Sequence, residues 1–172
     1  MKKIGVLIGK LYEESEYSQP AKAFKDAGYQ LVHIGKEKGK EVLDKNHENP
    51  VTIDAVAEDV SPNDFEALLI PGGFSPDVLR SDDKIVDFLR NYFTLGKPLF
   101  TICHGPQLLV TAEVLRGRTL TCYKSIIVDV KNAGANYVDR EVVVDQNLIT
   151  SRTPKDLPAF IEASLQMLKE RS

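Results

Sequence analysis

Residues 98–107, PLFTICHGPQ, join a short apolar strand directly to the start of a helix. The pair Gly105-Pro106 favours a helix start, because proline is common in the first helical turn. Cys103 stands at the junction, where N–H groups of the following helix favour an anion. The pattern predicts a reactive cysteine whose thiol ionises readily. The alternative is a small buried residue that closes the strand, a role that requires neither His104 nor the Gly-Pro pair.

Apolar runs and helical patterns alternate on both sides of this stretch. In the polar segment 35–60 we expect a small hairpin at the sheet edge, and Ser61-Pro62 is typical of a helix cap. This alternation predicts an α/β fold with a mainly parallel sheet, helices on both faces and a binding crevice at the carboxyl ends of the strands. The expected strands are 3–8, 30–34, 67–70, 98–102, 119–121, 128–130, 142–144 and 148–150, and the expected helices are 20–27, with Pro20 at its start, 83–95, 104–115 and 157–169.

Length and composition predict one globular domain over residues 1–172. The chain is 42% apolar and 27% charged, which is enough to bury a full-sized core. The net charge is −3 with no basic block, so we expect no nucleic-acid or anionic-membrane surface. No apolar run approaches the roughly 18 residues of a membrane span, and the N-terminal run is too short for a signal peptide. With two cysteines and no export signal, a reducing cytoplasm fits best.

Three groups of residues follow strand ends and are expected to meet in the crevice. The glutamates Glu13, Glu14 and Glu16 follow the first strand, Gly72-Gly73 follows the third, and Cys103-His104 follows the fourth. Glycines let backbone N–H groups approach a substrate, as an oxyanion hole requires, although the same pair also suits a plain turn. The glutamates suit either a site or a solvated turn.

The three histidines narrow the possible mechanisms. No histidine follows His104, which excludes papain-like and class I glutamine amidotransferase triads within one chain. His33 lies on an expected strand and is interpreted as a core or edge residue, and His47 lies in a polar loop and is interpreted as solvated. We expect no metal and no cofactor, because the histidines lack cysteines at ligand spacing. Cys122 is interpreted as a structural strand residue, with a redox partner of Cys103 as the alternative.

Five motifs in order resemble the PfpI family of intracellular protease-like proteins, and the likeness covers nearly the whole chain. The resemblance implies a flavodoxin-like three-layer sandwich, a cytoplasmic stress role, and homodimers that can stack into hexamers. The motifs are ALLIPGG at 67–73, ICHGPQ at 102–107, KNAGA at 131–135, EVVVD at 141–145 and TSRTP at 150–154.

The resemblance also implies a role for each site residue. Cys103 would be the nucleophile, and Glu16 the carboxyl group that hydrogen-bonds its thiol or thiolate. Gly73 and the backbone N–H of His104 would form the oxyanion hole, and Asp77 matches the acid that reaches His104 of a neighbouring subunit. Archaeal members of the family carry Glu where this chain has Asp77, which is one methylene shorter. The turn at 44–47 also lacks the glycines that many relatives have there.

Three activities remain open at this stage. The leading hypothesis is a glyoxalase or deglycase, in which Cys103 attacks methylglyoxal or its adducts on amines and thiols. The first alternative is a cysteine peptidase with a Cys103-His104-Asp77 triad completed across a subunit interface. The second is a redox-sensing stress protein or holdase, in which Cys103 is oxidised. The expected partners are a small carbonyl substrate or glycated adducts, and further copies of the chain.

Overall fold

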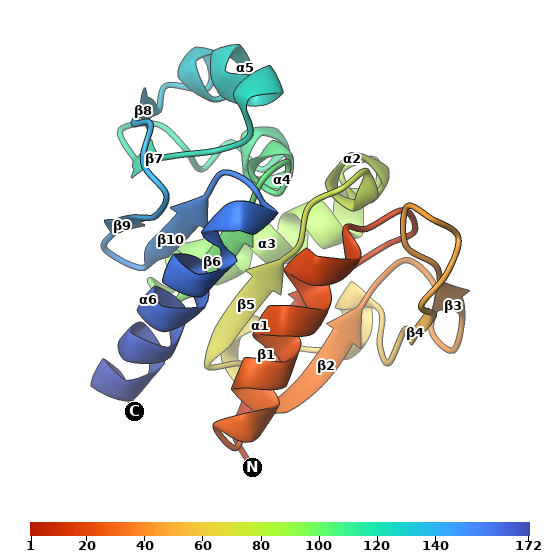
Figure 1. Ribbon diagram of the computed structural model, residues 1–172. Helices are drawn as coiled ribbons and strands as arrows, with labels where there is room; N and C mark the ends of the chain where they lie inside the picture. The colour runs from red at the N-terminus through yellow and green to blue at the C-terminus, as the bar shows by residue number, and fades with distance from the viewer.

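Six strands form the central sheet, in the order β2-β1-β5-β6-β10-β9. The computed structural model describes all 172 residues. Every neighbouring pair is parallel except β9 and β10, so the predicted mainly parallel sheet is confirmed (Figure 1). The strands are β1 Lys3–Leu7, β2 Gln30–Ile34, β5 Ala67–Ile70, β6 Leu99–Ile102, β9 Val143–Asp145 and β10 Leu148–Ser151.

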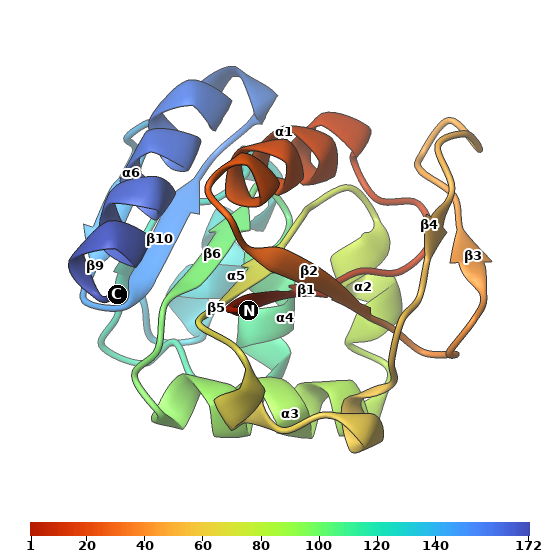
Figure 2. The ribbon, with the colours of Figure 1, turned by 90° about the horizontal axis from the view of Figure 1, so that it is seen from below.

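Helices cover both faces of this sheet. In Figure 2, α1 and α6 lie above the sheet and α3 lies below it. Buried side chains of α2 to α5 share an apolar cluster with one face, and those of α1 and α6 share a cluster with the other. The expected flavodoxin-like three-layer sandwich is therefore confirmed. The helices are α1 Glu14–Asp26, α2 Ser75–Leu79, α3 Asp83–Thr94, α4 Pro106–Thr111, α5 Ile127–Asn132 and α6 Leu157–Glu170.

Two small sheets and four short 3₁₀ turns complete the fold. The predicted hairpin forms from β3 Glu41–Val42 and β4 Val51–Thr52, and Ala55, shortly after β4, is bridged to Ile34 at the end of β2. The hairpin turn lacks glycine, and His47 and Asn49 take the left-handed conformations themselves, with φ of 59° and 51°. The remaining elements are β7 Thr119–Leu120, parallel to β8 Asn136–Tyr137, and the turns Ala57–Asp59, Pro62–Asp64, Lys124–Ile126 and Pro154–Asp156.

The start of the first helix differs from the prediction. Helix α1 begins at Glu14, six residues before the expected start, and Pro20 lies inside it. The earlier start was not predictable from capping residues, because Glu13 at the N-cap makes no side-chain cap hydrogen bond. The end of the helix is as predicted, since Gly28 adopts a φ of 97° and the Tyr29 N–H donates to the Phe24 carbonyl.

Three further differences lie on the α2–α5 side of the sheet. The expected strand 128–130 is wrong: it lies inside α5, because Ile126 and Val130 are buried four residues apart while Val128 is 65% exposed. Helix α4 is shorter than expected, ending before Glu113, which has a φ of 58°. The five-residue helix α2 was not predicted.

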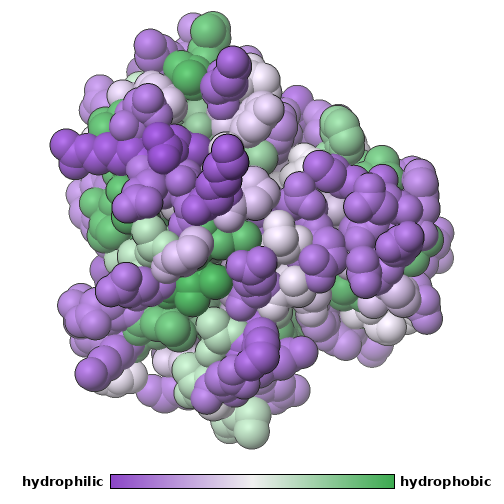
Figure 3. Space-filling view, in the orientation of Figure 1, coloured by the Kyte–Doolittle hydropathy of each residue, from purple (hydrophilic) through white to green (hydrophobic).

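Polar side chains cover most of the surface. In the view of Figure 3, apolar residues are exposed only in small groups between polar ones. None of the helices combines the length and the apolar character that a membrane crossing requires.

Candidate active site

Cys103 occupies a strained turn between β6 and α4. Its φ is 63°, a left-handed conformation that is costly for a residue other than glycine. Two hydrogen bonds hold this backbone: the Cys103 N–H donates to the Ser151 carbonyl at 3.0 Å, and the Cys103 carbonyl accepts from the Tyr123 N–H at 3.0 Å. A side chain at Gly105 would overlap Thr101 Oγ1, so only glycine permits the next bend. The fold thus maintains a tight turn that carries the cysteine.

Glu16 reaches the same point from the first turn of α1, and its side chain is fully buried. The Gly72 N–H donates to Oε1 at 2.9 Å, whereas Oε2 has no hydrogen-bond partner. A Cβ atom at Gly72 would lie 2.5 Å from Glu16 Oε1 and 3.0 Å from Cys103 Cβ, so glycine is required where the three residues meet. Burial raises the pKa of Glu16 to about 8, so the carboxyl group is largely protonated at pH 7.

The Cys103 thiol is more protected than the sequence predicts. Cys103 is only 7% exposed, and burial raises the pKa of its thiol, as does the charge of Glu16 once that carboxyl group is ionised. The His104 backbone N–H donates to the sulfur and acts in the opposite direction. Burial thus acts against the ready ionisation that the sequence predicts for this thiol, so attack by the sulfur is helped by a base.

His104 is placed to be that base. Its Nδ1 lies 3.4 Å from the Cys103 Sγ, and its Nε2 lies 3.1 Å from the Ser125 hydroxyl. The ring stacks on Tyr123 with centroids 4.8 Å apart. Burial, and then the positive charge of Lys45, lower the pKa of His104, so the imidazole is neutral at pH 7 and can accept a proton.

Gly73 lies beside this cluster in a conformation that suits glycine, with a φ of 76°. A Cβ atom there would lie 2.6 Å from both the Leu11 carbonyl oxygen and the Glu13 nitrogen. The Gly73 N–H makes no hydrogen bond within the chain. It is thus free to donate to a negatively charged oxygen of a substrate, as the predicted oxyanion hole requires.

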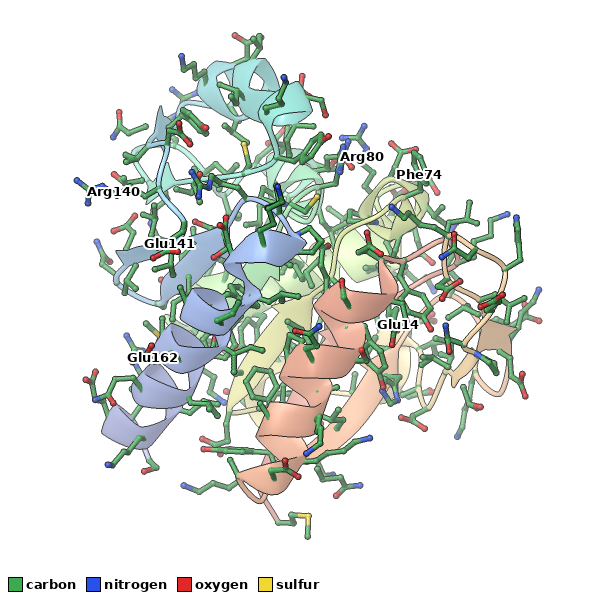
Figure 4. All side chains as sticks on the ribbon, in the orientation of Figure 1. Glu14, Phe74, Arg80, Arg140, Glu141 and Glu162 are labelled. Atoms are coloured by element: carbon green, nitrogen blue, oxygen red, sulfur yellow. The ribbon has the colours of Figure 1, made fainter.

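Asp77 is the one predicted site residue that the chain does not bring to the others. It lies in the first turn of α2, and its carboxylate forms an ion pair with Arg80 at 2.9 Å. Figure 4 shows Phe74 and Arg80 at α2, above the N-terminal end of α1 that carries Glu14. The Asp77 side chain is 61% exposed and makes no contact with His104 of its own chain. Its role at a neighbouring subunit stays a prediction.

A match with a family model decides the relationship of this chain to known proteins. The description of that model is DJ-1/PfpI family, and it matches residues 2–167. The chain belongs to the DJ-1/PfpI family.

Two relatives are similar to this DJ-1/PfpI family member over nearly their whole length. The chain is 56% identical over 170 residues to General stress protein 18 of Bacillus subtilis (strain 168), covering 98% of this chain and 99% of that protein. It is 54% identical over 168 residues to Protein/nucleic acid deglycase 2 of Escherichia coli (strain K12), covering 97% and 98%.

A solved structure supports the same fold. A protein from Anabaena variabilis that contains DJ-1/ThiJ/PfpI-like and ferritin-like domains matches 98% of this chain with a TM-score of 0.95 and 36% identity. The DJ-1/PfpI family member described here spans about half of that two-domain protein, 48% of its length.

Several residues of the DJ-1/PfpI site were not predicted. Ser125 and Tyr123 come from the segment between β7 and α5, which carries no recognisable motif. Lys45 in the hairpin turn forms an ion pair with Glu13 at 3.1 Å and influences the pKa of His104. The lysine could have been found only from the position of the hairpin in space.

The other two histidines and the second cysteine of this DJ-1/PfpI protein make no hydrogen bond to the site residues. His33 hydrogen-bonds Asp54 and Tyr17 at the sheet edge, as its interpretation as an edge residue predicts. Cys122 is buried and, like Cys103, is a free thiol. No group of three His, Cys, Asp or Glu residues is arranged to hold a metal ion.

Proposed function

We propose that this protein is a cysteine-dependent stress-response enzyme that converts reactive carbonyls by glyoxalase or deglycase chemistry. The nucleophile is Cys103, and the substrate is methylglyoxal or its adducts on amines and thiols. The observation that carries the proposal is the buried Glu16 carboxyl group, protonated at pH 7 and in contact with a strained cysteine turn. The name of one relative, a deglycase, supports this reaction class, and the name of the other, a general stress protein, supports a role in stress.

The first step forms a hemithioacetal. His104 Nδ1 takes the thiol proton as Sγ bonds to the aldehyde carbon, and the carbonyl electron pair moves to oxygen. The Gly73 N–H donates to this oxygen, as does the His104 N–H once the sulfur has bonded to carbon and no longer needs it, and the oxygen then receives a proton from Glu16 or from the His104 imidazolium. Because protonated Glu16 is neutral, it does not repel the sulfur as negative charge develops.

The second step moves hydrogen within the bound substrate. A base, the Glu16 carboxylate or His104, removes the proton from the former aldehyde carbon, and a proton is returned to the neighbouring carbon. The product is a thioester of lactate on Cys103. Water attacks the thioester, the carbon–sulfur bond breaks, and the thiol recovers a proton. One methylglyoxal and one water thus give one lactic acid, with no outside oxidant or reductant.

The peptidase alternative needs a different arrangement. Its histidine must protonate an amine leaving group, a task for which an oriented imidazole with a carboxylate partner is best suited. In this chain His104 Nε2 contacts a hydroxyl, that of Ser125, whereas Asp77 pairs with Arg80. The peptidase therefore depends on an oligomer that brings Asp77 to a neighbour's His104. The redox-sensor alternative needs only oxidation of Cys103.

One experiment separates these functions. Lactate formation from methylglyoxal, amine release from glycated peptides, and peptide release from casein are measured on the same purified protein and on its Cys103→Ala variant. We expect turnover of the carbonyl substrates that disappears in Cys103→Ala. Cysteine-dependent release of peptides alone would instead establish the peptidase. No turnover in any assay, with ready peroxide oxidation of Cys103, would establish the sensor.

A further inference from the structure

The first turn of α1, which carries Glu16, has few restraints of its own. Glu13 at the N-cap makes no side-chain cap hydrogen bond, and the Tyr17 N–H reaches the Glu13 carbonyl only at 3.3 Å. Pro20 has no N–H to donate to the Glu16 carbonyl, so the regular bond between this turn and the next cannot form. Contacts outside the helix therefore have a larger share in holding this turn in place than in a regular, capped helix.

A chain of three side chains ties this turn to the edge of the sheet. The Tyr17 hydroxyl lies 2.7 Å from His33 Nε2 on β2. His33 Nδ1 lies 2.9 Å from Asp54 Oδ2, and the His33 backbone N–H donates to the same oxygen at 2.8 Å. Since the Asp54 carboxylate only accepts, Nδ1 carries the proton and Nε2 accepts from the Tyr17 hydroxyl. Burial lowers the pKa of His33, which supports this neutral form at pH 7.

Tyr17 also contacts Tyr12, which lies beside Gly73. Its ring packs edge-on against Tyr12, with centroids 5.7 Å apart. Tyr12 is buried, bridges to Gly73, and donates its hydroxyl to the Asn49 carbonyl. Because Tyr17 directly follows Glu16, a fixed Tyr17 ring fixes the rotation of the helical turn that points Glu16 at Gly72 and Cys103.

We propose that Tyr17, held by His33 and Asp54, is the positioning residue that keeps Glu16 against Cys103. The inference rests on the proposed function for its consequence in catalysis, but the position of Glu16 can be measured without substrate. A loosened turn lets water reach the Glu16 carboxyl group, which makes its ionisation easier.

The test is Tyr17→Phe, which removes one hydroxyl and keeps the ring against Tyr12. Iodoacetamide alkylation of Cys103 is followed against pH by mass spectrometry, where ionisation of Glu16 produces an inflection near pH 8. We expect this inflection to move toward acid by about half a pH unit or more. We also expect kcat with methylglyoxal to fall roughly threefold to tenfold, with KM changed less than about twofold.

Matched variants separate positioning from general damage. Tyr29→Phe alters another half-buried tyrosine whose hydroxyl makes no hydrogen bond, and it should leave the inflection unchanged. Asp54→Asn keeps an acceptor oxygen for His33 and should resemble the unmutated protein, whereas Asp54→Ala should resemble Tyr17→Phe. His33→Ala breaks the same link from the other side and provides a second variant if Tyr17→Phe does not fold.

Failure of this inference is distinct from failure of the proposed function. An unchanged alkylation inflection in folded Tyr17→Phe and His33→Ala would overturn the positioning role, whatever the turnover. If the inflection moves while the unmutated protein produces no lactate or free amine, the positioning role stands and the carbonyl chemistry is wrong.

Discussion

Cys103, directly after β6, and Cys122, two residues after β7, are both buried, yet their surroundings differ in kind. Burial raises the pKa of both thiols, that of Cys122 to about 12. Only Cys103 has a left-handed backbone, a buried carboxyl group within reach and an imidazole 3.4 Å from its sulfur. The nucleophile is thus distinguished by backbone strain and by its polar neighbours rather than by exposure or by a lowered pKa.

The two cysteines also belong to different halves of the core. Cys103 packs in the apolar cluster under α1 and α6, and Cys122 packs in the cluster under α2 to α5. The main causes of the raised pKa of Cys122 are burial and the charge of Asp129. This favours the structural interpretation of Cys122 over a redox partnership with Cys103.

The largest expected effect is the difference in turnover between a variant without the Cys103 thiol and one without the Cys122 thiol. Cys103→Ala should lower carbonyl turnover by about a thousandfold or more, because no other nucleophile lies at the turn. Cys122→Ala should keep turnover within about twofold and cost about 1 kcal/mol of unfolding free energy, as expected for a small buried side chain. Steady-state kinetics and urea unfolding of both variants measure the difference, and equal loss of turnover in the two would remove the distinction.

The second effect is on stability and concerns Glu16, the buried carboxyl group that lies beside Cys103 and has no counterpart beside Cys122. Burial raises the pKa of Glu16 from 4.5 to about 8, so the folded protein binds a proton that the unfolded chain has released between these values. The contribution of Glu16 is therefore fully present below pH 4.5 and is lost as the pH rises to 8, by an amount on the order of 4 kcal/mol.

Glu16→Gln should remove this loss. We expect the variant to be more stable than the unmutated protein at pH 9, by a few kcal/mol, with a smaller difference at pH 5. Thermal unfolding at the two pH values provides the measurement, and Glu14→Gln, on the same helical turn but half-buried, is the control. A variant that loses stability equally at both pH values would show that Glu16 is an ordinary structural residue.

The third effect is on the pH dependence of the reaction. If protonated Glu16 is required, kcat/KM should fall as the pH rises through about 8, and Glu16→Gln should lower it about a hundredfold at pH 7 while removing that alkaline limb. The limb should survive in Cys122→Ala. Profiles from pH 5.5 to 9.5 check this, and an alkaline limb retained in Glu16→Gln would assign it to another group.

Much of the fold follows from local patterns in the sequence. The runs 30–34 and 67–70 form strands with the predicted bounds. The continuous apolar run ALLI at 67–70 has few alternatives inside a parallel sheet, whereas QLVHI at 30–34 is the mixed pattern of an edge strand. The prediction for 128–130 failed because a valine at every second position resembles a strand, whereas Ile126 and Val130, four residues apart, lie on one buried side of a helix and Val128 is exposed. Helix α1 failed at its start because Pro20 sits inside a helix whose N-cap has no capping side chain.

The site residues also fall into those that the sequence predicts and those that only the structure reveals. Cys103, Glu16, Gly73 and His104 follow strand ends, and the fold brings these strand ends together. The protonation of Glu16 and the raised pKa of Cys103 depend on burial by α1, which no local motif encodes. Ser125, Tyr123 and Lys45 reach His104 or its surroundings from segments distant in the chain, so their roles required the three-dimensional arrangement.

The smallest expected effect tests whether the surroundings of Cys103 are completed by a second subunit. Within one chain Asp77 pairs with Arg80 and is 61% exposed, so Asp77→Ala should change carbonyl turnover less than about threefold. Asp87→Ala is a matched control, because Asp87 forms a similar exposed pair with Arg90 on α3. Casein cleavage, if present, should fall much further in Asp77→Ala than in Asp87→Ala, since amine departure needs an oriented imidazole.

Mixing two inactive variants then tests whether Asp77 acts within its own chain or across a subunit interface. If Asp77 orients His104 of a neighbour, Asp77→Ala and His104→Ala are each deficient in peptide cleavage, but an oligomer of both contains some interfaces that pair an intact His104 with an intact Asp77. Phe74, 61% exposed just before α2, places apolar surface beside Asp77, as an interface there would require. Co-refolding the two variants should therefore restore part of the cleavage activity. Because each chain lacks one of the two groups, activity no higher than that of the separate variants, in a mixed oligomer confirmed by mass spectrometry, would show that Asp77 does not act on the His104 of a neighbour.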